Sequence, residues 1–554
     1  MIPSVNKPWL KYYSHDDLCT PLPEGSIYDF LYENNRDHSC DIALDYFGRK
    51  ITYGQLFEQI EKTAGSFAAL GINPGDIVMI VSVTTPEIIC AFYALNRLGA
   101  IANMADPRTS AEGIREYIRE TNCKLVIALD ACYGKIAEAV KETSAETVLV
   151  VSPADSLPSL MKLVYKLKTK QPEAADNTLF WQEFLRSSID YTPAIGKKED
   201  CCVIVHTGGT TGTPKGVMLS NENLNASVIQ CDKSGFDFRR GDKWLGVMPP
   251  FIAYGIGNGL HLPLCMGMTL IVLPKFDPNK YDALLLKHKP NHIAGVPSHY
   301  NTIIHSRKLK NKDLSFLRSP IVGGDGMQVQ LEEEVSRFLR SHGCPAGVIK
   351  GYGMTEVCAA ICATAKNEFN KPGSVGIPFT HSVMAVFDGE RELPCGEVGE
   401  ICMWGPHVML GYYGNEAETN AILRTHADGS RWVHSGDLGY IDSDGCVFIQ
   451  GRIKRVIIRY DGFKEFPSMI ENGLLNYPAV QACCVVGHDD KKQGCGKIPV
   501  AFVVWKHGME DVSGLETHCK KHLPEYVLPA SYRTIDALPL TNIGKVDYRK
   551  LEQK

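Results

Sequence analysis

The sequence lacks the features by which several classes of protein are recognised. Its 19 cysteines include no C-x-x-C pair, so the paired ligands typical of structural zinc are missing. No apolar run approaches the ~20 residues that span a bilayer, and residues 1–8 lack the basic-then-apolar pattern of a signal peptide. There is no long lysine or arginine run, so nucleic acid is not expected as a partner. We therefore expect a cytoplasmic enzyme whose thiols stay reduced.

The composition is that of a globular protein large enough for several domains. The chain has 554 residues, of which 44% are apolar and 22% are charged, and its net charge is only -5. A single hydrophobic core rarely serves so long a chain, so we expect roughly two to four domains. No internal repeat or low-complexity segment is visible in the sequence.

Helix-like and strand-like segments alternate along the first part of the chain. Residues 53–70 have the apolar spacing of an amphipathic helix, and residues 86–98 have it again. Residues 76–82 and 124–129 are short, apolar and rich in β-branched side chains, as buried strands are. Strands that alternate with helices indicate an α/β fold with parallel, helix-covered sheets. We expect the alternation to resume at residue 202 and to run to about residue 450.

The last part of the chain has a different pattern. Residues 481–487 and 498–505 have the composition of strands, and residues 515–523 that of a helix. This pattern indicates a small α+β domain that follows a hinge near Gly451.

A basic segment at residues 157–170 interrupts the α/β alternation. Its apolar residues recur at near-helical spacing among four lysines. One interpretation is a helix that lies on a membrane surface and helps to gather a lipid-like substrate. The other interpretation is a solvated surface insertion, and we favour it because the segment is short.

A glycine- and threonine-rich loop follows a short apolar strand at residues 201–205. Residues 206–217 read His-Thr-Gly-Gly-Thr-Thr-Gly-Thr-Pro-Lys-Gly-Val. Glycines let backbone N–H groups converge on phosphate oxygens, threonine hydroxyls donate hydrogen bonds, and Lys215 adds a compact positive charge. The loop matches neither the Walker A pattern nor G-x-G-x-x-G. A flexible surface turn is the alternative, but the composition favours a polyphosphate site.

This loop resembles the T-S-G-T-T-G-x-P-K-G signature of the adenylate-forming superfamily, which contains acyl- and aryl-CoA synthetases, firefly luciferase and peptide-synthetase adenylation domains. The resemblance covers roughly residues 40–550, with the motifs in the family's order. It implies a large N-terminal domain at residues 1–451, a hinge at 452–454 and a mobile C-terminal domain at 455–554. Gly208 departs from the family's serine, which removes one hydroxyl from the phosphate cradle. The residues that would hold the phosphates are Thr207, Gly208, Gly209, Thr210, Thr211, Gly212 and Lys215.

Residues 351–356, Gly-Tyr-Gly-Met-Thr-Glu, resemble the family's Y-G-x-T-E element. By this resemblance Tyr352 stacks on adenine, Thr355 contacts the α-phosphate and Glu356 binds Mg²⁺. A single carboxylate suits magnesium, which favours one or two carboxylates together with phosphate oxygens. Alone, the hexapeptide could be a tight turn that opens a helix.

Three further segments match the family by position. Asp437, in Trp-Val-His-Ser-Gly-Asp, corresponds to the residue that holds both ribose hydroxyls, and Arg452 would also reach the ribose. Gly324 and Asp325 belong to a Gly-Gly-acidic turn whose backbone would lie against adenine. Lys454 occupies the hinge position, where the backbone torsion changes between two domain orientations.

Residues 540–547 resemble the family's N-G-K-V element, which makes Lys545 the expected catalytic lysine. Attack of a carboxylate on the α-phosphate spreads negative charge over the phosphoryl oxygens, and a fixed ammonium stabilises that charge. Thr355, Glu356 and Lys215 would complete the catalytic group.

In this family the acid lies beside the segment that corresponds to residues 249–259. The resemblance implies contacts from Ala253, Tyr254, Gly255 and Met354. This stretch is similar to that of benzoate-type CoA ligases, whereas the chain as a whole is similar to bacterial fatty-acyl-CoA synthetases.

Ile252 argues against amino acids as substrates. Amino-acid activators usually have an aspartate at this position to hold the α-ammonium group, and an apolar residue would leave a buried ammonium without a partner. Fatty acids and aryl acids both remain open.

The sequence therefore predicts an ATP-dependent acid–CoA ligase that forms an acyl-AMP and then a thioester, with ATP, Mg²⁺ and coenzyme A as cofactors and co-substrates. One alternative is a stand-alone adenylation enzyme that loads a phosphopantetheinyl carrier protein. Another is a non-catalytic homologue that only binds nucleotide. Fold analogy alone does not separate these functions.

Overall fold

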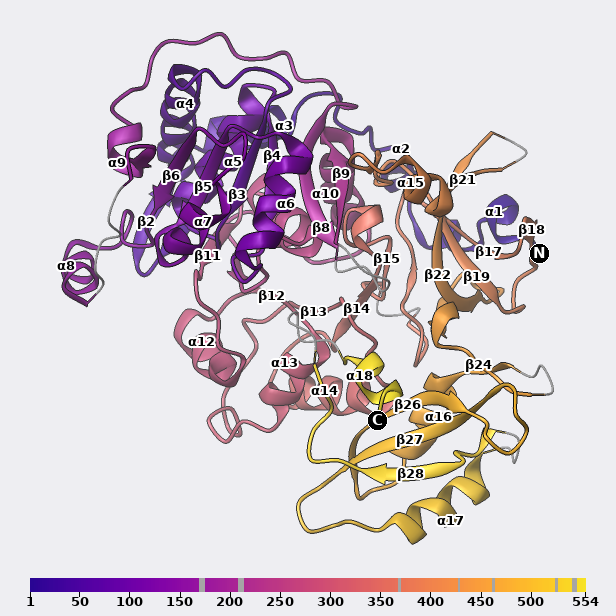
Figure 1. Cartoon of the computed structure of the whole chain (residues 1–554). Coiled ribbons are helices and arrows are strands. Elements are labelled where there is room, and N and C mark those ends of the chain that lie inside the picture. Colours follow the sequence, from indigo (N-terminus) through magenta and orange to yellow (C-terminus); the bar gives the residue numbers. More distant parts are fainter. Residues whose placement is uncertain are drawn as a thin grey trace.

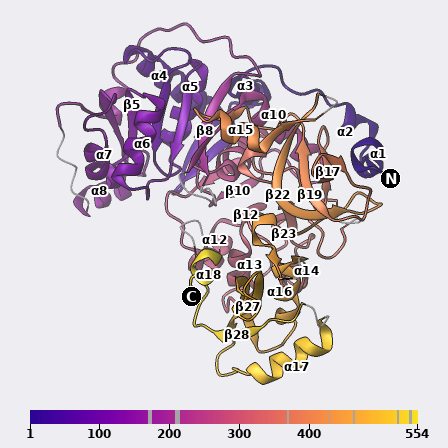
Figure 2. The ribbon, with the colours of Figure 1, turned by 45° about the vertical axis from the view of Figure 1, so that its right-hand side comes forward.

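The computed structural model describes residues 1–168, 175–207, 214–366, 370–426, 429–460, 464–523, 527–540 and 546–554. A large N-terminal domain carries mixed sheets and their covering helices, and a small α+β domain ends the chain (Figure 1, Figure 2). This arrangement confirms the predicted fold class.

The first sheet of the N-terminal domain has a parallel centre. Its parallel strands run from β8 through β4, β3, β5 and β6 to β7, while β9 and β20 are added antiparallel at one edge. In sheet order the strands are β20 (Gly411–Tyr412), β9 (Lys215–Ser220), β8 (Cys201–Thr207), β4 (Ile101–Ala105), β3 (Ile77–Val81), β5 (Leu125–Leu129), β6 (Thr147–Val151) and β7 (Thr178–Phe180).

Helices cover both faces of this sheet, and in strand β3 alternate side chains pack against the helices of opposite faces. Val78 and Ile80 pack in the core that holds α4 and α5, whereas Met79 and Val81 pack with α6 and α7. Successive side chains of a strand point to opposite faces, so an all-apolar strand needs a cover on each side. The helices are α4 (Tyr53–Ala69), α5 (Pro86–Arg97), α6 (Ala111–Thr121) and α7 (Tyr133–Ala139). The predicted helices and strands of this region are thus confirmed to within a residue or two.

The second sheet carries the strands whose ends build the site. Strands β1 and β11–β14 run parallel with β10, and β2, β15 and β16 are antiparallel additions. Its order is β16 (Ile377–Pro378), β15 (Cys362–Ala363), β14 (Ile349–Tyr352), β13 (Ser319–Val322), β12 (His292–Gly295), β10 (Lys243–Gly246), β11 (Thr269–Val272), β1 (Ile42–Tyr46) and β2 (Arg49–Thr52). The neighbouring helices are α3 (Ile27–Asn35), α10 (Asn221–Lys233), α11 (Leu262–Cys265), α12 (Tyr281–His288), α13 (Pro297–Ile304) and α14 (Val329–Ser341).

The third sheet is antiparallel, and it corrects the expectation that α/β alternation continues to about residue 450. The alternation ends at β14, and the following strands are joined by short turns such as residues 389–390. A parallel crossover needs a dozen or more residues, so turns of this length permit only antiparallel pairing. The strands are β17 (Val383–Asp388), β18 (Arg391–Glu392), β19 (Gly399–Trp404), β21 (Leu423–Thr425), β22 (Arg431–Ile441) and β23 (Val447–Arg452). The helices nearby in sequence or space are α1 (Pro3–Asn6), α2 (His15–Cys19) and α15 (Glu416–Ile422).

The C-terminal domain has its own core, which confirms the predicted strands and helix there. Strands β26 and β27 pair antiparallel, and β28 runs parallel to β27. Val485, Val503 and Leu515 are fully buried among the apolar residues of this domain. Its elements are β24 (Ile457–Ile458), β25 (Lys464–Glu465), α16 (Pro467–Leu475), β26 (Val480–Asp489), β27 (Lys497–Trp505), α17 (Val512–His522), β28 (Ser531–Thr534) and α18 (Tyr548–Glu552).

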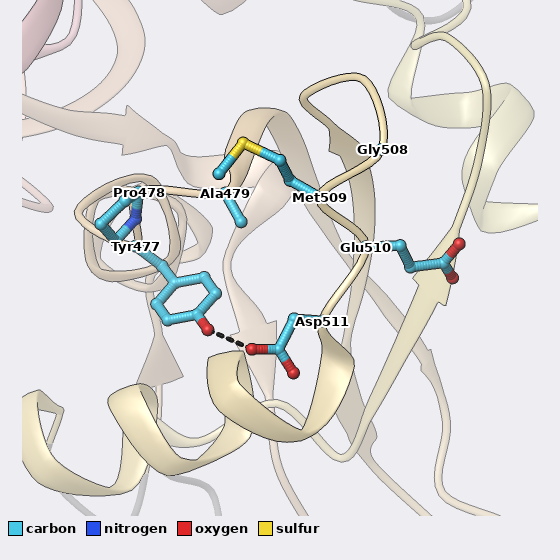
Figure 3. A pocket seen from close by; sticks show the side chains of 7 residues that line it. All are labelled: Tyr477, Pro478, Ala479, Gly508, Met509, Glu510 and Asp511. Carbon is cyan, nitrogen blue, oxygen red and sulfur yellow. Dashed lines mark hydrogen bonds between the residues drawn. The ribbon is translucent and has the colours of Figure 1, made fainter.

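A shallow pocket lies on the surface of this small domain, between the end of α16 and the start of α17 (Figure 3). The Tyr477 hydroxyl donates a hydrogen bond to Asp511, and Asp511 also accepts from the backbone N–H of Gly514 at 2.8 Å. The carboxylate is therefore used to cap α17, and the pocket follows from this local packing.

The segment from β6 to β7 contains helix α8 (Ser159–Lys168), and the short helix α9 (Trp181–Phe184) follows β7. The helical spacing seen in the sequence is thus confirmed. Over the residues that the structure describes, no helix combines the length and the apolar character that crossing a bilayer requires.

Candidate active site

The carboxyl ends of two neighbouring parallel strands bring the predicted adenine contacts together. Strands β13 and β14 pair in the register Val322 to Lys350, so the turn after β13 and the end of β14 lie side by side. Gly324 follows β13 with a φ of +79°, a backbone conformation that side-chain-bearing residues rarely adopt. Asp325 is exposed, and its carboxylate accepts from the backbone N–H of Gly326 at 2.8 Å. The turn therefore presents its backbone next to Tyr352.

Tyr352, Asp437 and Arg452 form one hydrogen-bonded group. The Tyr352 hydroxyl donates to Oδ2 of Asp437 at 2.7 Å, and Nε of Arg452 lies 2.8 Å from Oδ1. The pairing of β22 with β23 sets Asp437 opposite Arg452, which also donates to the backbone oxygen of Ser435 at 3.0 Å. Burial and the neighbouring Asp437 raise the pKa of Tyr352, so its hydroxyl stays protonated and keeps donating. Three separate roles were expected for these residues, and the structure joins them in one hydrogen-bonded group.

Glu400 holds the turn that carries Asp437, and the sequence reasoning missed it. Its Oε1 accepts from the backbone N–H of Gly436 at 2.9 Å, and its Oε2 pairs with Nδ1 of His434 at 2.8 Å. Burial alone would raise the pKa of Glu400, but the hydrogen bonds from His434 and Gly436 outweigh it and lower the pKa. The carboxylate therefore stays charged and fixes the backbone just before Asp437.

The thiol of Cys402 also lies near Glu400 and His434. Sγ of Cys402 is 3.4 Å from Nδ1 of His434, so Glu400, Cys402 and His434 could together approach a metal ion. The Nδ1 atom is already bonded to the Glu400 carboxylate, and burial raises the pKa of the Cys402 thiol. Hydrogen bonding accounts for the cluster without an ion.

Glu356 and Lys215 meet through Tyr412, a second residue that the sequence reasoning missed. Glu356 is 6% exposed, and its Oε1 accepts from the Tyr412 hydroxyl at 2.7 Å. Nζ of Lys215 lies 4.9 Å from the centre of the Tyr412 ring and forms an ion pair with Glu418. Burial, and then Glu356, raise the pKa of Tyr412, so the hydroxyl remains a donor. One tyrosine therefore orients both the carboxylate and the lysine.

The backbone explains why Tyr412 reaches this place. Strand β20 has only two residues, and it pairs with β9 in the register Tyr412 to Val217. Strand β9 in turn pairs with β8, with Thr207 opposite Lys215. The two ends of the glycine-rich loop are thereby held together, with Tyr412 across the strand from the loop's exit. Gly208, Gly209, Thr210, Thr211 and Gly212 lie outside the described residues, as does Lys545.

The predicted acid segment forms a π-helix, η4 (Tyr254–His261), directly after Ala253. Such wide turns are frequent at functional sites. A side chain at Gly255 would place its Cβ 1.6 Å from the backbone oxygen of Pro249, so only glycine fits there. The Tyr254 ring lies 3.7 Å from where a Cβ on Gly323 would stand, and burial raises the pKa of its hydroxyl. The acid segment and the predicted adenine turn are therefore in contact.

The loop that contains Met354 also packs on this π-helix. The backbone N–H of Ala359 returns to the backbone oxygen of Met354 at 3.2 Å, and Sγ of Cys358 lies 3.6 Å from where a Cβ on Gly257 would stand. Gly353 has no space for a side chain, since a Cβ would lie 2.0 Å from the backbone oxygen of Ala359. The structure thus brings Met354 to the same region as Tyr254.

Thr355 begins the short 3-10 helix η6 (Thr355–Val357) that also carries Glu356. Lys454 lies in another 3-10 turn, η8 (Ile453–Arg455), immediately after β23 and before the C-terminal domain. Its side chain is exposed. The residue therefore lies between the third sheet and the first strand of the C-terminal domain.

Comparison with known proteins gives a consistent result. Residues 31–413 match the family model of AMP-binding enzymes, and residues 469–545 match that of the AMP-binding enzyme C-terminal domain. A long-chain-fatty-acid–CoA ligase of Bacillus subtilis is 30% identical over 98% of this chain and 97% of its own. A 4-coumarate–CoA ligase of Petroselinum crispum is 31% identical over 94% of this chain and 92% of its own.

Solved structures extend the likeness to the fold. ATP-bound MatB from Rhodopseudomonas palustris is 26% identical, with a TM-score of 0.80 over 95% of this chain and 98% of that chain. The anthranilate CoA ligase AuaEII in complex with anthranoyl-AMP has the same fold, with a TM-score of 0.83 over 96% of this chain and 97% of that chain at 21% identity.

Proposed function

Since this chain belongs to the family of AMP-binding enzymes, we propose that it activates a fatty acid. It is an acid–CoA ligase: it joins a carboxylic acid to coenzyme A through an acyl-adenylate. The observation that carries the choice of acid is the match to the long-chain ligase of Bacillus subtilis, which spans nearly the full length of both chains. The acid segment supports it, because residues 252–260 contain no charged side chain that would hold an ammonium or a second carboxylate.

In the first half-reaction, a carboxylate oxygen of the acid attacks the α-phosphorus of ATP. A new P–O bond forms, the bond to the β-phosphate oxygen breaks, and pyrophosphate leaves with the electron pair. Thr355 would donate to the α-phosphate, and Lys215 and Lys545 would offset the charge that develops on the phosphoryl oxygens. Tyr352 and the turn at Gly324 would hold adenine.

Asp437 would accept hydrogen bonds from the ribose hydroxyls, and Arg452 would support it. Tyr352 and Arg452 each contact one oxygen of this carboxylate. A carboxylate oxygen has lone pairs for more than one donor, so both contacts are compatible with a bound ribose. Glu400 would act on the ribose contact indirectly, because it fixes the turn before Asp437.

Glu356 is the residue that would hold Mg²⁺. Magnesium favours one or two carboxylates together with phosphate oxygens, and Glu356 offers a single buried carboxylate whose Oε1 is fixed by Tyr412. When bound, the ion supplies positive charge to the phosphate oxygens as pyrophosphate leaves. The residues present therefore fit the ion.

For the second half-reaction, we place the N-terminal domain at residues 1–451, the hinge at 452–454 and the mobile domain at 455–554. Rotation about Lys454 would withdraw Lys545 and admit the thiol of coenzyme A. The thiol sulfur attacks the acyl carbon, the thiol proton is lost, and AMP leaves as the C–O bond breaks. A phosphopantetheinyl carrier protein would present the same thiol and is the alternative acceptor.

An aryl acid is the second candidate, because 4-coumarate–CoA ligases are 30% to 32% identical to this chain. A panel of benzoate, 4-coumarate and fatty acids of increasing length, read by pyrophosphate release with coenzyme A, separates the two. We expect the highest kcat/KM with long-chain fatty acids. Preference for an aryl acid by tenfold or more would reject the fatty-acid proposal and leave the ligase chemistry intact.

A further inference from the structure

Helix α8 (Ser159–Lys168) turns its apolar side away from the protein. Its five large apolar residues are exposed: Leu160 by 76%, Met161 by 41%, Leu163 by 58%, Val164 by 44% and Leu167 by 78%. The helix stands at the periphery of the N-terminal domain in both views (Figure 1, Figure 2). A surface helix of a globular protein normally buries its apolar face, so this orientation needs an explanation.

Polar contacts hold the helix in this orientation. The Tyr165 hydroxyl donates to Oδ2 of Asp130 at 3.0 Å, and Nζ of Lys162 donates to the backbone oxygen of Asp155 at 3.2 Å. At about 100° per residue, these two side chains lie on one side of the helix, opposite to Leu160 and Leu167. The polar side is thus fastened to the protein, and the apolar side is presented to the surroundings.

The charges of this segment indicate what covers the apolar side. The sequence has no acidic residue from 156 to 172, and it has lysines at 162, 166, 168 and 170, in a chain whose net charge is -5. Exposed leucines together with lysines fit the boundary between the acyl chains and the negative headgroups of a bilayer. A protein partner would need an apolar groove with an acidic rim, whereas an anionic bilayer offers apolar acyl chains and negative headgroups together.

We propose that α8 docks this enzyme reversibly on anionic phospholipid bilayers. Leu160, Leu163, Val164 and Leu167 enter the acyl-chain boundary, and the net positive charge of the segment is attracted to the phosphate headgroups. With only about ten residues, the helix lies in the plane of the surface and does not cross it. Its use, delivery of a membrane-dissolved acid to the site, rests on the proposed function, but the docking itself does not.

The test uses the full-length enzyme and vesicles of phosphatidylcholine, with or without a third of phosphatidylglycerol, in a sedimentation assay without fatty acid. We expect the wild type to bind the anionic vesicles, and more weakly as salt is raised. The combined change Leu160→Asp, Leu163→Asp and Leu167→Asp should lower the partition coefficient at least tenfold. The matched control changes three other exposed apolar residues, Val5, Ile189 and Ile195, to Asp and should bind as the wild type does.

Activity and size measurements complete the test. The α8 variant should retain wild-type turnover of a water-soluble medium-chain acid, which shows that it is folded. Equal vesicle binding by the wild type and the α8 variant, or equal loss in the control variant, would overturn the proposal. So would a dimer of the wild type that the α8 variant loses while neither binds vesicles, because the face would then join two copies. Binding is measured without substrate, so a failure of the fatty-acid proposal leaves this result readable on its own.

Discussion

Replacing Tyr412 with phenylalanine removes the hydroxyl that contacts Glu356 and leaves the aromatic ring in place. The hydroxyl donates to Oε1 of Glu356 at 2.7 Å, and Glu356 is 6% exposed. A buried acceptor that loses its donor costs about 1–3 kcal/mol, and more when it is charged. At 1.4 kcal/mol for each factor of ten, we expect adenylate formation to fall by about 5- to 150-fold.

The assay is acid-dependent exchange of labelled pyrophosphate into ATP, measured over a series of Mg²⁺ concentrations. Because Glu356 would hold the ion, the loss in Tyr412→Phe should be largest at low Mg²⁺ and partly recovered at high Mg²⁺. The ring still faces Lys215, so Tyr412→Leu, which also removes the cation–π contact, should be slower again. Exchange by Tyr412→Phe at the wild-type rate at every Mg²⁺ concentration would refute this reasoning. Equal losses in exchange and in thioester formation from supplied acyl-adenylate would point to general damage.

Other changes test separate parts of the account. Lys545→Ala should lower adenylate formation by about 100-fold or more while thioester formation from supplied acyl-adenylate is largely kept; equal loss of both would contradict the hinge proposal. Glu400→Gln should raise the KM for ATP by about tenfold with little change in kcat, because the turn at Gly436 loosens before Asp437; an unchanged KM would remove Glu400 from the site. Glu87→Gln tests stability: burial raises the pKa of Glu87 from 4.5 to about 7. The folded state therefore binds more protons than the unfolded one between these values, and wild-type stability falls as pH rises through this window. Relative to wild type, the variant should gain about 3 kcal/mol between pH 4.5 and pH 7, read as a thermal midpoint shift that grows over this window; a shift independent of pH would contradict the assignment.

Local patterns in the sequence were enough to predict most of the fold. In the helix at residues 53–70 and the strands at 76–82 and 498–505, the spacing of apolar residues follows from which side chains face the core. The structure confirms all three elements. The antiparallel sheet from β17 to β23 was not predicted, because the sequence of a short strand does not show which other strand it pairs with. Pairing is decided by the rest of the fold.

The candidate site divides in the same way. Tyr352, Asp437 and Arg452 could be named from motifs, and the structure brings them together. Glu400 and Tyr412 could not be named, because their importance comes from β19 pairing with β22 and β20 pairing with β9. The local sequence offers only the dipeptides Gly399-Glu400, which opens β19, and Gly411-Tyr412, which forms β20. Neither dipeptide indicates a role in the site. Helix α8 shows a further limit: helical spacing reveals an apolar face, but not whether that face points inward.

Exchange of labelled pyrophosphate into ATP, with a fatty acid and without coenzyme A, tests the central claim most directly. An enzyme that forms an acyl-adenylate must catalyse this exchange when acid, ATP and Mg²⁺ are all present, and must release AMP and a thioester when coenzyme A is added. We predict both results with a long-chain fatty acid. If no fatty or aryl acid supports exchange above the acid-free background, the chain only binds nucleotide and the account is wrong.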